Sequence, residues 1–170
     1  MHLMLNPLVE SQVYEIEMLV IGLGNTLLKD EGIGVHVVNA LRNHPLPSGV
    51  ELIDGATMGV DLLNYILDSD RVIIVDAAKM GLKPGEYRNF GLSEIDMDNV
   101  PSLSLHDLSL PETLALGQII AGLPPMVIIG IEPETIDPGD DLSAPLKSSF
   151  TNIVSHVYDT ILNFSEEVVN

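Results

Sequence analysis

Short apolar runs alternate along this chain with longer segments whose apolar residues recur every three or four positions. The short runs are typical of strands buried on both faces of a sheet, and the longer spacing is typical of one face of a helix. Strands that alternate with helices form right-handed crossovers, which make the strands parallel. The alternation therefore predicts a three-layer α/β fold, in which a mainly parallel, twisted sheet of about five strands has helices on both faces.

The individual elements can be placed from this pattern. We expect five strands, over residues 17–22, 50–53, 71–77, 87–90 and 126–131. The third run is the most apolar and is expected at the centre of the sheet, whereas 87–90 is expected as a short edge strand. We expect four helices, over residues 31–43, 57–67, 109–121 and 143–162. Ser109 and Glu112 fit the S-x-x-E capping box at the start of the third helix.

Length and charge restrict the domain organisation and the partners. A chain of 170 residues with 46% hydrophobic residues suits one domain. We expect a catalytic domain over 18–164, an N-terminal extension over 1–17 and a C-terminal tail over 165–170. The 25 acidic and 7 basic residues give a net charge of −18, which argues against binding to nucleic acid or an anionic membrane.

Targeting signals are not apparent in the sequence. We find no apolar run of the roughly 18 residues that a membrane span requires, and the N-terminus lacks the basic residues of a secretory signal. The chain has no cysteine, which excludes disulfides, thiolate metal ligands and thiol nucleophiles. We therefore expect a cytoplasmic protein. We also expect it to act as a monomer.

Polar and glycine-rich segments follow several of the predicted strands. They are Gly22-Leu23-Gly24-Asn25 with Asp30-Glu31, then the segment 54–59 (DGATMG), then Asp76, and last Glu132. Ligands of open parallel sheets bind beyond the carboxyl ends of the strands, so these residues are expected along one edge. The first segment is not a dinucleotide fingerprint, because Leu27 occupies the position of its third glycine.

Three residues at this edge could take part in chemistry. Asp76 ends the central strand, Glu31 begins a helix, and His106 lies in a polar loop before a capped helix. Each has a structural interpretation as well: Asp76 as a helix cap, Glu31 as a first-turn acid favoured by the helix dipole, and His106 as a loop histidine without a role. Together, two carboxylates and one imidazole suit a divalent metal such as zinc or nickel.

Four segments in this order resemble the hydrogenase maturation endopeptidases, which process the large subunit of nickel–iron hydrogenases. They are GLGNTLLKDEGIG, DGATMG, VIIVDAA and SLHDLSL, and the resemblance extends over about residues 18–162. It implies that Glu31, Asp76 and His106 bind metal and carry the catalysis. We expect substrate contacts from residues in and near the first two segments, namely Gly24, Asn25, Asp54, Gly55 and Thr57.

The resemblance also implies a reaction. Such an enzyme removes a C-terminal extension from the large-subunit precursor after nickel insertion, and the substrate's own nickel is the recognition signal. Zinc or cadmium could replace nickel in a crystal. Either a divalent ion polarises the scissile carbonyl or activates water, or a carboxylate acts as general base. The sequence thus implies an aspartyl-type or metal-dependent endopeptidase.

Two other functions are compatible with parts of the pattern. A non-catalytic maturation chaperone could use the same ligands to check nickel loading. Peptidyl-tRNA hydrolases also have a strand followed by GLGN, with a catalytic histidine some ten residues later, and His36 follows Asn25 by eleven residues here. However, His36 lies in a predicted helix, and the net charge of −18 opposes binding to tRNA.

Overall fold

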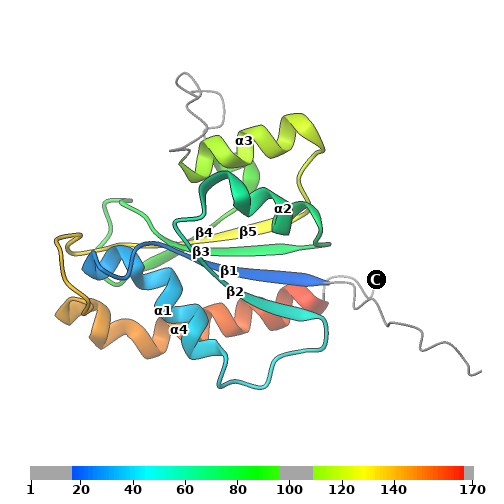
Figure 1. Ribbon diagram of the computed structural model, residues 1–170. Helices are drawn as coiled ribbons and strands as arrows, with labels where there is room; N and C mark the ends of the chain where they lie inside the picture. Colours follow the sequence, from blue (N-terminus) through cyan, green and yellow to red (C-terminus); the bar gives the residue numbers. More distant parts are fainter. Residues whose placement is uncertain (1–16, 96–108, 167–170) are drawn as a thin grey trace, which may run out of the picture.

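The protein is a five-stranded sheet between two layers of helices (Figure 1). The structure, a computed structural model, describes residues 17–95 and 109–166. The strands are β1 (Met18–Leu23), β2 (Val50–Ala56), β3 (Val72–Ala77), β4 (Tyr87–Phe90) and β5 (Met126–Ile131). Their order is β2-β1-β3-β5-β4; β4 runs antiparallel to β5, and the other pairs are parallel. This confirms the predicted fold, the central third strand and the short edge strand.

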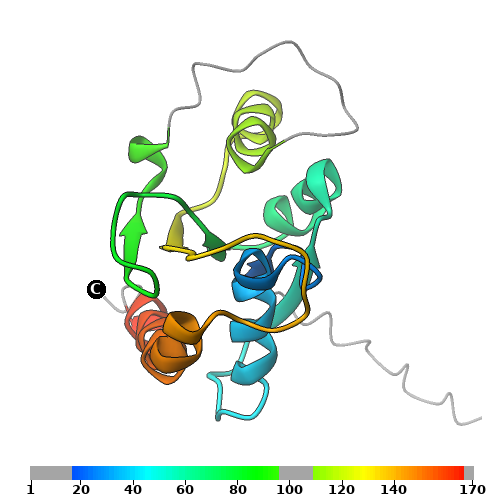
Figure 2. The same ribbon diagram turned by 90° about the vertical axis from the view of Figure 1, so that its left-hand side faces the viewer.

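The helices divide between the two faces of the sheet (Figures 1 and 2). Helices α1 (Ile33–Leu41) and α4 (Ala144–Glu166) cover one face, and α2 (Leu62–Leu67) and α3 (Leu110–Ile120) cover the other. Three 3-10 turns complete the described elements: η1 (Lys29–Gly32), η2 (Gly59–Asp61) and η3 (Leu92–Glu94). In residues 17–95 and 109–166, no helix combines the length and apolar character needed to cross a bilayer.

Several boundaries differ from those predicted. Glu31 lies in η1 rather than in the first turn of an α-helix, and α2 is shorter than expected because η2 precedes it. Strand β2 continues past Ile53, since Gly22 pairs with Asp54 and Leu23 with Ala56. Helix α4 continues to Glu166 rather than ending near residue 162. The Arg71 guanidinium donates a hydrogen bond to the carbonyl of Phe164, which supports this last turn.

The core forms two layers because successive residues of each strand point to opposite faces. Val20 and Val75 pack against α1 and α4, whereas Leu19 and Ile74 pack against α2 and α3. All six residues of β1 are buried. A continuous apolar run is therefore needed in β1, and this is the pattern from which the strand was predicted.

The strand register confirms the predicted edge. Gly22 of β1 pairs with Asp54 on one side and Val75 on the other, and Asp76 pairs with Gly130. Glu132 directly follows β5. The carboxyl ends of the four parallel strands thus meet at one edge of the sheet, from which the loops after β1, β2, β3 and β5 emerge.

Helix α1 contacts the sheet backbone to backbone. A Cβ atom on Gly34 would lie 2.1 Å from the carbonyl oxygen of Val75, and one on Gly22 would lie 2.2 Å from that of Gly34. Side chains at these positions would separate α1 from β1 and β3. The two glycines therefore set how closely η1, which directly precedes α1, approaches the edge of the sheet.

We expect Gly34→Ala to destabilise the protein by at least about 2 kcal/mol, because the added methyl group overpacks a backbone contact. Gly91→Ala is the matched control. Gly91 has φ −89° and ψ 168°, and the nearest atom to an added Cβ is 4.0 Å away, so its effect should be near zero. Urea denaturation followed by circular dichroism measures both. Equal stability of the two variants would contradict this account of the contact.

Candidate active site at the carboxyl edge of the sheet

A buried carboxylate organises the loop after β5. Asp30 is fully buried, and its Oδ2 accepts hydrogen bonds from the backbone N–H groups of Glu134 (3.0 Å) and Thr135 (3.1 Å). Its Oδ1 accepts one from the N–H of Ser143 at 2.7 Å. Burial by itself would raise the pKa of Asp30, but these hydrogen bonds outweigh it and hold the pKa below its usual value. Asp30 therefore joins η1 to the loop after β5 and is not open to a ligand.

Glu132 plays a similar part for the loop after β3. Its side chain is buried, and its Oε2 accepts hydrogen bonds from the N–H groups of Met80 (2.6 Å) and Leu82 (3.2 Å). The backbone of Glu132 also bonds to Gly85 and Glu86, at 2.9 Å in each case. The predicted edge position of Glu132 is confirmed, and its contacts there are with the neighbouring loop.

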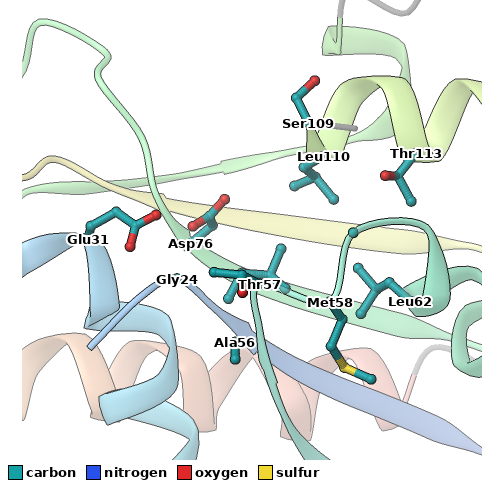
Figure 3. A pocket seen from close by; sticks show the side chains of 12 residues that line it. Gly24, Glu31, Ala56, Thr57, Met58, Leu62, Asp76, Ser109, Leu110 and Thr113 are labelled. Carbon is teal, nitrogen blue, oxygen red and sulfur yellow. The ribbon is translucent and has the colours of Figure 1, made fainter. Parts of the chain in front are cut away.

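A cavity of about 370 Å³ lies beside these loops (Figure 3). Its walls come from the end of β1, η1, the segment after β2, the start of α2, the end of β3 and the start of α3. The residues that line it are Leu23, Gly24, Glu31, Ala56, Thr57, Met58, Gly59, Leu62, Asp76, Ser109, Leu110 and Thr113. The cavity therefore lies at the carboxyl edge, where parallel α/β sheets bind their ligands.

Two carboxylates face one another in this cavity. Glu31 extends from η1 and Asp76 from the end of β3, and their side chains point toward each other in Figure 3. The N–H of Asn25 donates to Oε2 of Glu31, and the N–H of Ala77 donates to Oδ1 of Asp76 at 2.8 Å. Each carboxylate therefore has one oxygen engaged by the backbone.

The position of Glu31 near Asp76 depends on Gly24. This residue has φ +115°, which disfavours other side chains, and an added Cβ would lie only 1.8 Å from the carbonyl oxygen of Glu31. Gly24 thus lets η1 fold back onto the end of β1. The glycine acts through this close contact, which brings Glu31 within the same cavity as Asp76.

The surroundings of Asp76 change its ionisation. Burial, together with the negative charge of Glu31, raises the pKa of Asp76 to about 7, although the hydrogen bond from Ala77 opposes the rise. Asp76 is therefore a mixture of acid and carboxylate at neutral pH. Two oxygen-donor groups that repel one another in a partly dry cavity fit a divalent cation, and an acid with this pKa also suits proton transfer.

The residues predicted to contact substrate divide into two groups. Gly24 and Thr57 line the cavity, whereas Asn25, Asp54 and Gly55 do not. The Oδ1 of Asn25 accepts a hydrogen bond from the N–H of Leu27 at 2.9 Å, and that of Asp54 accepts one from Ala56 at 3.0 Å.

Gly55 packs against β1. A Cβ there would lie 2.7 Å from the side chain of Ile21. Asn25 thus shapes the loop after β1, whereas Asp54 and Gly55 shape the end of β2. Contact of these three residues with substrate stays a prediction.

His106 lies outside the described residues. Among the residues that are described, no group of three or more His, Asp or Glu side chains is close enough to hold a metal ion. Glu31 and Asp76 supply two of the three expected ligands in one cavity. The complete metal set of Glu31, Asp76 and His106 therefore stays a prediction.

Helix α3 contributes residues that were not predicted. Ser109, Leu110 and Thr113 line the cavity from above the sheet. The predicted capping box is present, since the N–H and the hydroxyl of Ser109 both donate to Oε2 of Glu112 at 2.7 Å. The spacing i, i+1 and i+4 places the three residues on one side of the helix, but the periodicity does not show which side faces the site.

Comparisons with known proteins agree with this architecture. The model of the hydrogenase maturation protease family, HycI, matches residues 35–163. The hydrogenase expression/formation protein HupD of Thiocapsa roseopersicina is 32% identical over 157 residues, which cover 87% of this chain and 69% of the relative. The hydrogenase 2 maturation protease of Escherichia coli K12 is 29% identical over 157 residues, which cover 91% of this chain and 96% of the relative.

Solved structures give the same result. The hydrogenase-maturating endopeptidase HybD from Escherichia coli superposes with a TM-score of 0.75 and 30% identity, covering 86% of this chain and 93% of that one. The maturation protease HycI from Thermococcus kodakarensis has a TM-score of 0.68 and 21% identity, over 87% and 93% of the two chains; at that identity the likeness shows the fold. Because the family model matches most of the sequence, this chain belongs to the hydrogenase maturation proteases, which are hydrolases of peptide bonds.

Proposed function

We propose that this protein is an endopeptidase that removes the C-terminal extension of a nickel–iron hydrogenase large-subunit precursor after nickel insertion. It acts as a monomer in the cytoplasm. The observation that carries the proposal is the pair of facing carboxylates, Glu31 and Asp76, in an open cavity at the carboxyl edge of the sheet. Family membership supports the peptidase activity, and the carboxylates supply the chemistry.

Nickel enters this proposal as part of the substrate. The carboxylates of Glu31 and Asp76 repel one another, and the cavity walls limit the water that could screen them. A divalent cation relieves this repulsion and accepts both oxygens as ligands, with the imidazole of His106 as the third donor. A precursor that brings its own nickel would therefore bind more tightly here than a metal-free precursor.

Two routes to peptide hydrolysis fit the cavity. In one, Asp76 removes a proton from the attacking water and later returns it to the leaving amide nitrogen, a role that suits a pKa of about 7. In the other, the substrate's nickel polarises the scissile carbonyl or the water while Glu31 and Asp76 hold the ion. Both routes break the C–N bond, add hydroxide to the carbonyl carbon and give the nitrogen a proton.

The two alternative functions receive different support. A metal-checking chaperone would use the same cavity, but it would bind the precursor without cutting it, whereas the relatives are named proteases. A peptidyl-tRNA hydrolase would need the histidine that follows GLGN to lie at the site. That residue here is His36, which lies in α1 and lines a separate cavity with Ala40 and Phe150.

We expect Asp76→Asn, Glu31→Gln and His106→Ala each to reduce processing of nickel-loaded precursor at least about 100-fold, because each removes a ligand or base. The matched control is Glu51→Gln, which changes an exposed carboxylate on β2 to an amide and should leave processing unchanged. The assay follows loss of the C-terminal extension by mass spectrometry, with and without nickel in the precursor. Full activity in all three variants, or equal cleavage of metal-free precursor, would contradict the proposal.

The raised pKa of Asp76 predicts a stability change with a definite sign. Since this pKa is about 7 when the protein is folded and 3.8 when it is unfolded, the folded state holds the proton more tightly. The wild-type protein therefore loses stability as pH rises from about 4 to about 7. Asparagine does not titrate, so metal-free Asp76→Asn should melt roughly 5–15 °C above wild type at pH 8.

The difference in melting temperature between Asp76→Asn and the wild-type protein should shrink toward zero near pH 4. Thermal melts in the presence of a chelator, recorded at several pH values, measure it. The exposed control Glu51→Gln should show no such dependence. A variant that is less stable than wild type at pH 8 would show that the Asp76 carboxylate stabilises the fold.

A further inference from the structure

Three large apolar side chains are exposed on loops at the carboxyl edge of the sheet. Leu27, on the loop after β1, is 68% exposed, Ile136 after β5 is 45% exposed, and Leu82 after β3 is 38% exposed. Figure 2 looks onto this edge. Exposing such side chains costs free energy in water, and apolar side chains displayed on the loops beside a binding site are available to a bound partner.

Hydrogen bonds hold these loops together. The carbonyl of Leu27 accepts a hydrogen bond from the N–H of Gly139 at 2.9 Å, and the N–H of Lys29 donates to the carbonyl of Gly139 at 2.8 Å. The buried carboxylate of Asp30 accepts hydrogen bonds from backbone N–H groups of the loop after β5. That of Glu132 accepts them from backbone N–H groups of the loop after β3. The apolar side chains are thus displayed on loops that are already ordered, so docking there would lose little conformational entropy.

The loops are continuous with the candidate active site. The loop that carries Leu27 also supplies Gly24 and Glu31 to the cavity wall. Leu82 follows Asp76 by six residues, and Ile136 follows directly after the segment that Asp30 binds. A folded protein that delivers its C-terminal segment to Glu31 and Asp76 would approach the edge of the sheet from which these loops emerge.

We propose that Leu27, Leu82 and Ile136 form an apolar docking rim for the folded body of the precursor, apart from its C-terminal extension. This inference rests on the proposed function, because it takes the precursor as the occupant. The rim contributes affinity for the protein substrate, while Glu31 and Asp76 act on the peptide bond. The rim would thus bind the body of the precursor while the cavity takes up its C-terminal segment.

Other exposed apolar residues provide a matched control. Ile119 and Ile120 are 82% and 63% exposed, and they lie in the last turn of α3, whose first turn lines the cavity. They follow Thr113, the last residue of α3 that lines the cavity, by six and seven residues, which is roughly 10 Å along the helix. They exceed the rim residues in exposure, but they lie at the C-terminal end of α3 and do not line the cavity.

The test compares two double variants, Leu27→Gln with Ile136→Gln and Ile119→Gln with Ile120→Gln. We expect the rim pair to raise KM for nickel-loaded precursor at least tenfold, with kcat and the melting temperature unchanged. The control pair should leave both kinetic constants unchanged. Binding to metal-free precursor, which the proposed function expects to remain uncut, should weaken by a similar factor in the rim pair when measured by biolayer interferometry.

The outcomes separate this inference from the proposed function. Cleavage and binding that are unaffected in the rim pair, or equally weakened in the control pair, would overturn the docking rim alone. Binding that depends on the rim, without cleavage of either form of the precursor, would overturn the protease proposal and support the rim. Neither binding nor cleavage by the wild-type protein would overturn both.

Discussion

The close backbone contacts at three glycines, Gly22 in β1, Gly24 just after it and Gly34 in α1, are the constraint on which the site depends. Without side chains at Gly22 and Gly34, α1 can lie against the backbone of β1 and β3. Without one at Gly24, η1 can fold onto the strand end and bring Glu31 to the same cavity as Asp76. Backbone-to-backbone contacts tolerate little movement, so they position the carboxylate of Glu31 more rigidly than side-chain packing alone.

The four acids at the carboxyl edge of the sheet, Asp30, Glu31, Asp76 and Glu132, have two kinds of surroundings. Asp30 and Glu132 are satisfied by backbone N–H groups, which stabilise a charge without a neighbouring cation. Glu31 and Asp76 each receive a single backbone hydrogen bond and face one another. The first pair therefore stabilises the loops, whereas the second pair keeps an unrelieved repulsion. Such a local cost is expected where a structure is selected for binding or chemistry rather than for stability.

Much of the fold and part of the site could be predicted from the sequence, because both rest on local patterns. Apolar runs predict buried strands, and the residue after a parallel strand lies at the carboxyl edge, so Asp76 and Glu132 could be placed. The role of Asp30 could not, since its partners Thr135 and Ser143 lie more than a hundred residues away in the chain. Leu110 and Thr113 were missed because helical periodicity does not determine how α3 rotates over the sheet. The role of His106 stays a prediction.

The use of main-chain donors around Asp30 has an evolutionary consequence. Its three hydrogen bonds come from the N–H groups of residues 134, 135 and 143, and any amino acid except proline supplies the same donor. Side chains on this loop can therefore change from one descendant to another while its path is preserved. A gene duplication could then give two enzymes with the same catalytic edge and different outer surfaces, each matched to its own protein. In this way, a single buried aspartate makes the loop easier to diversify.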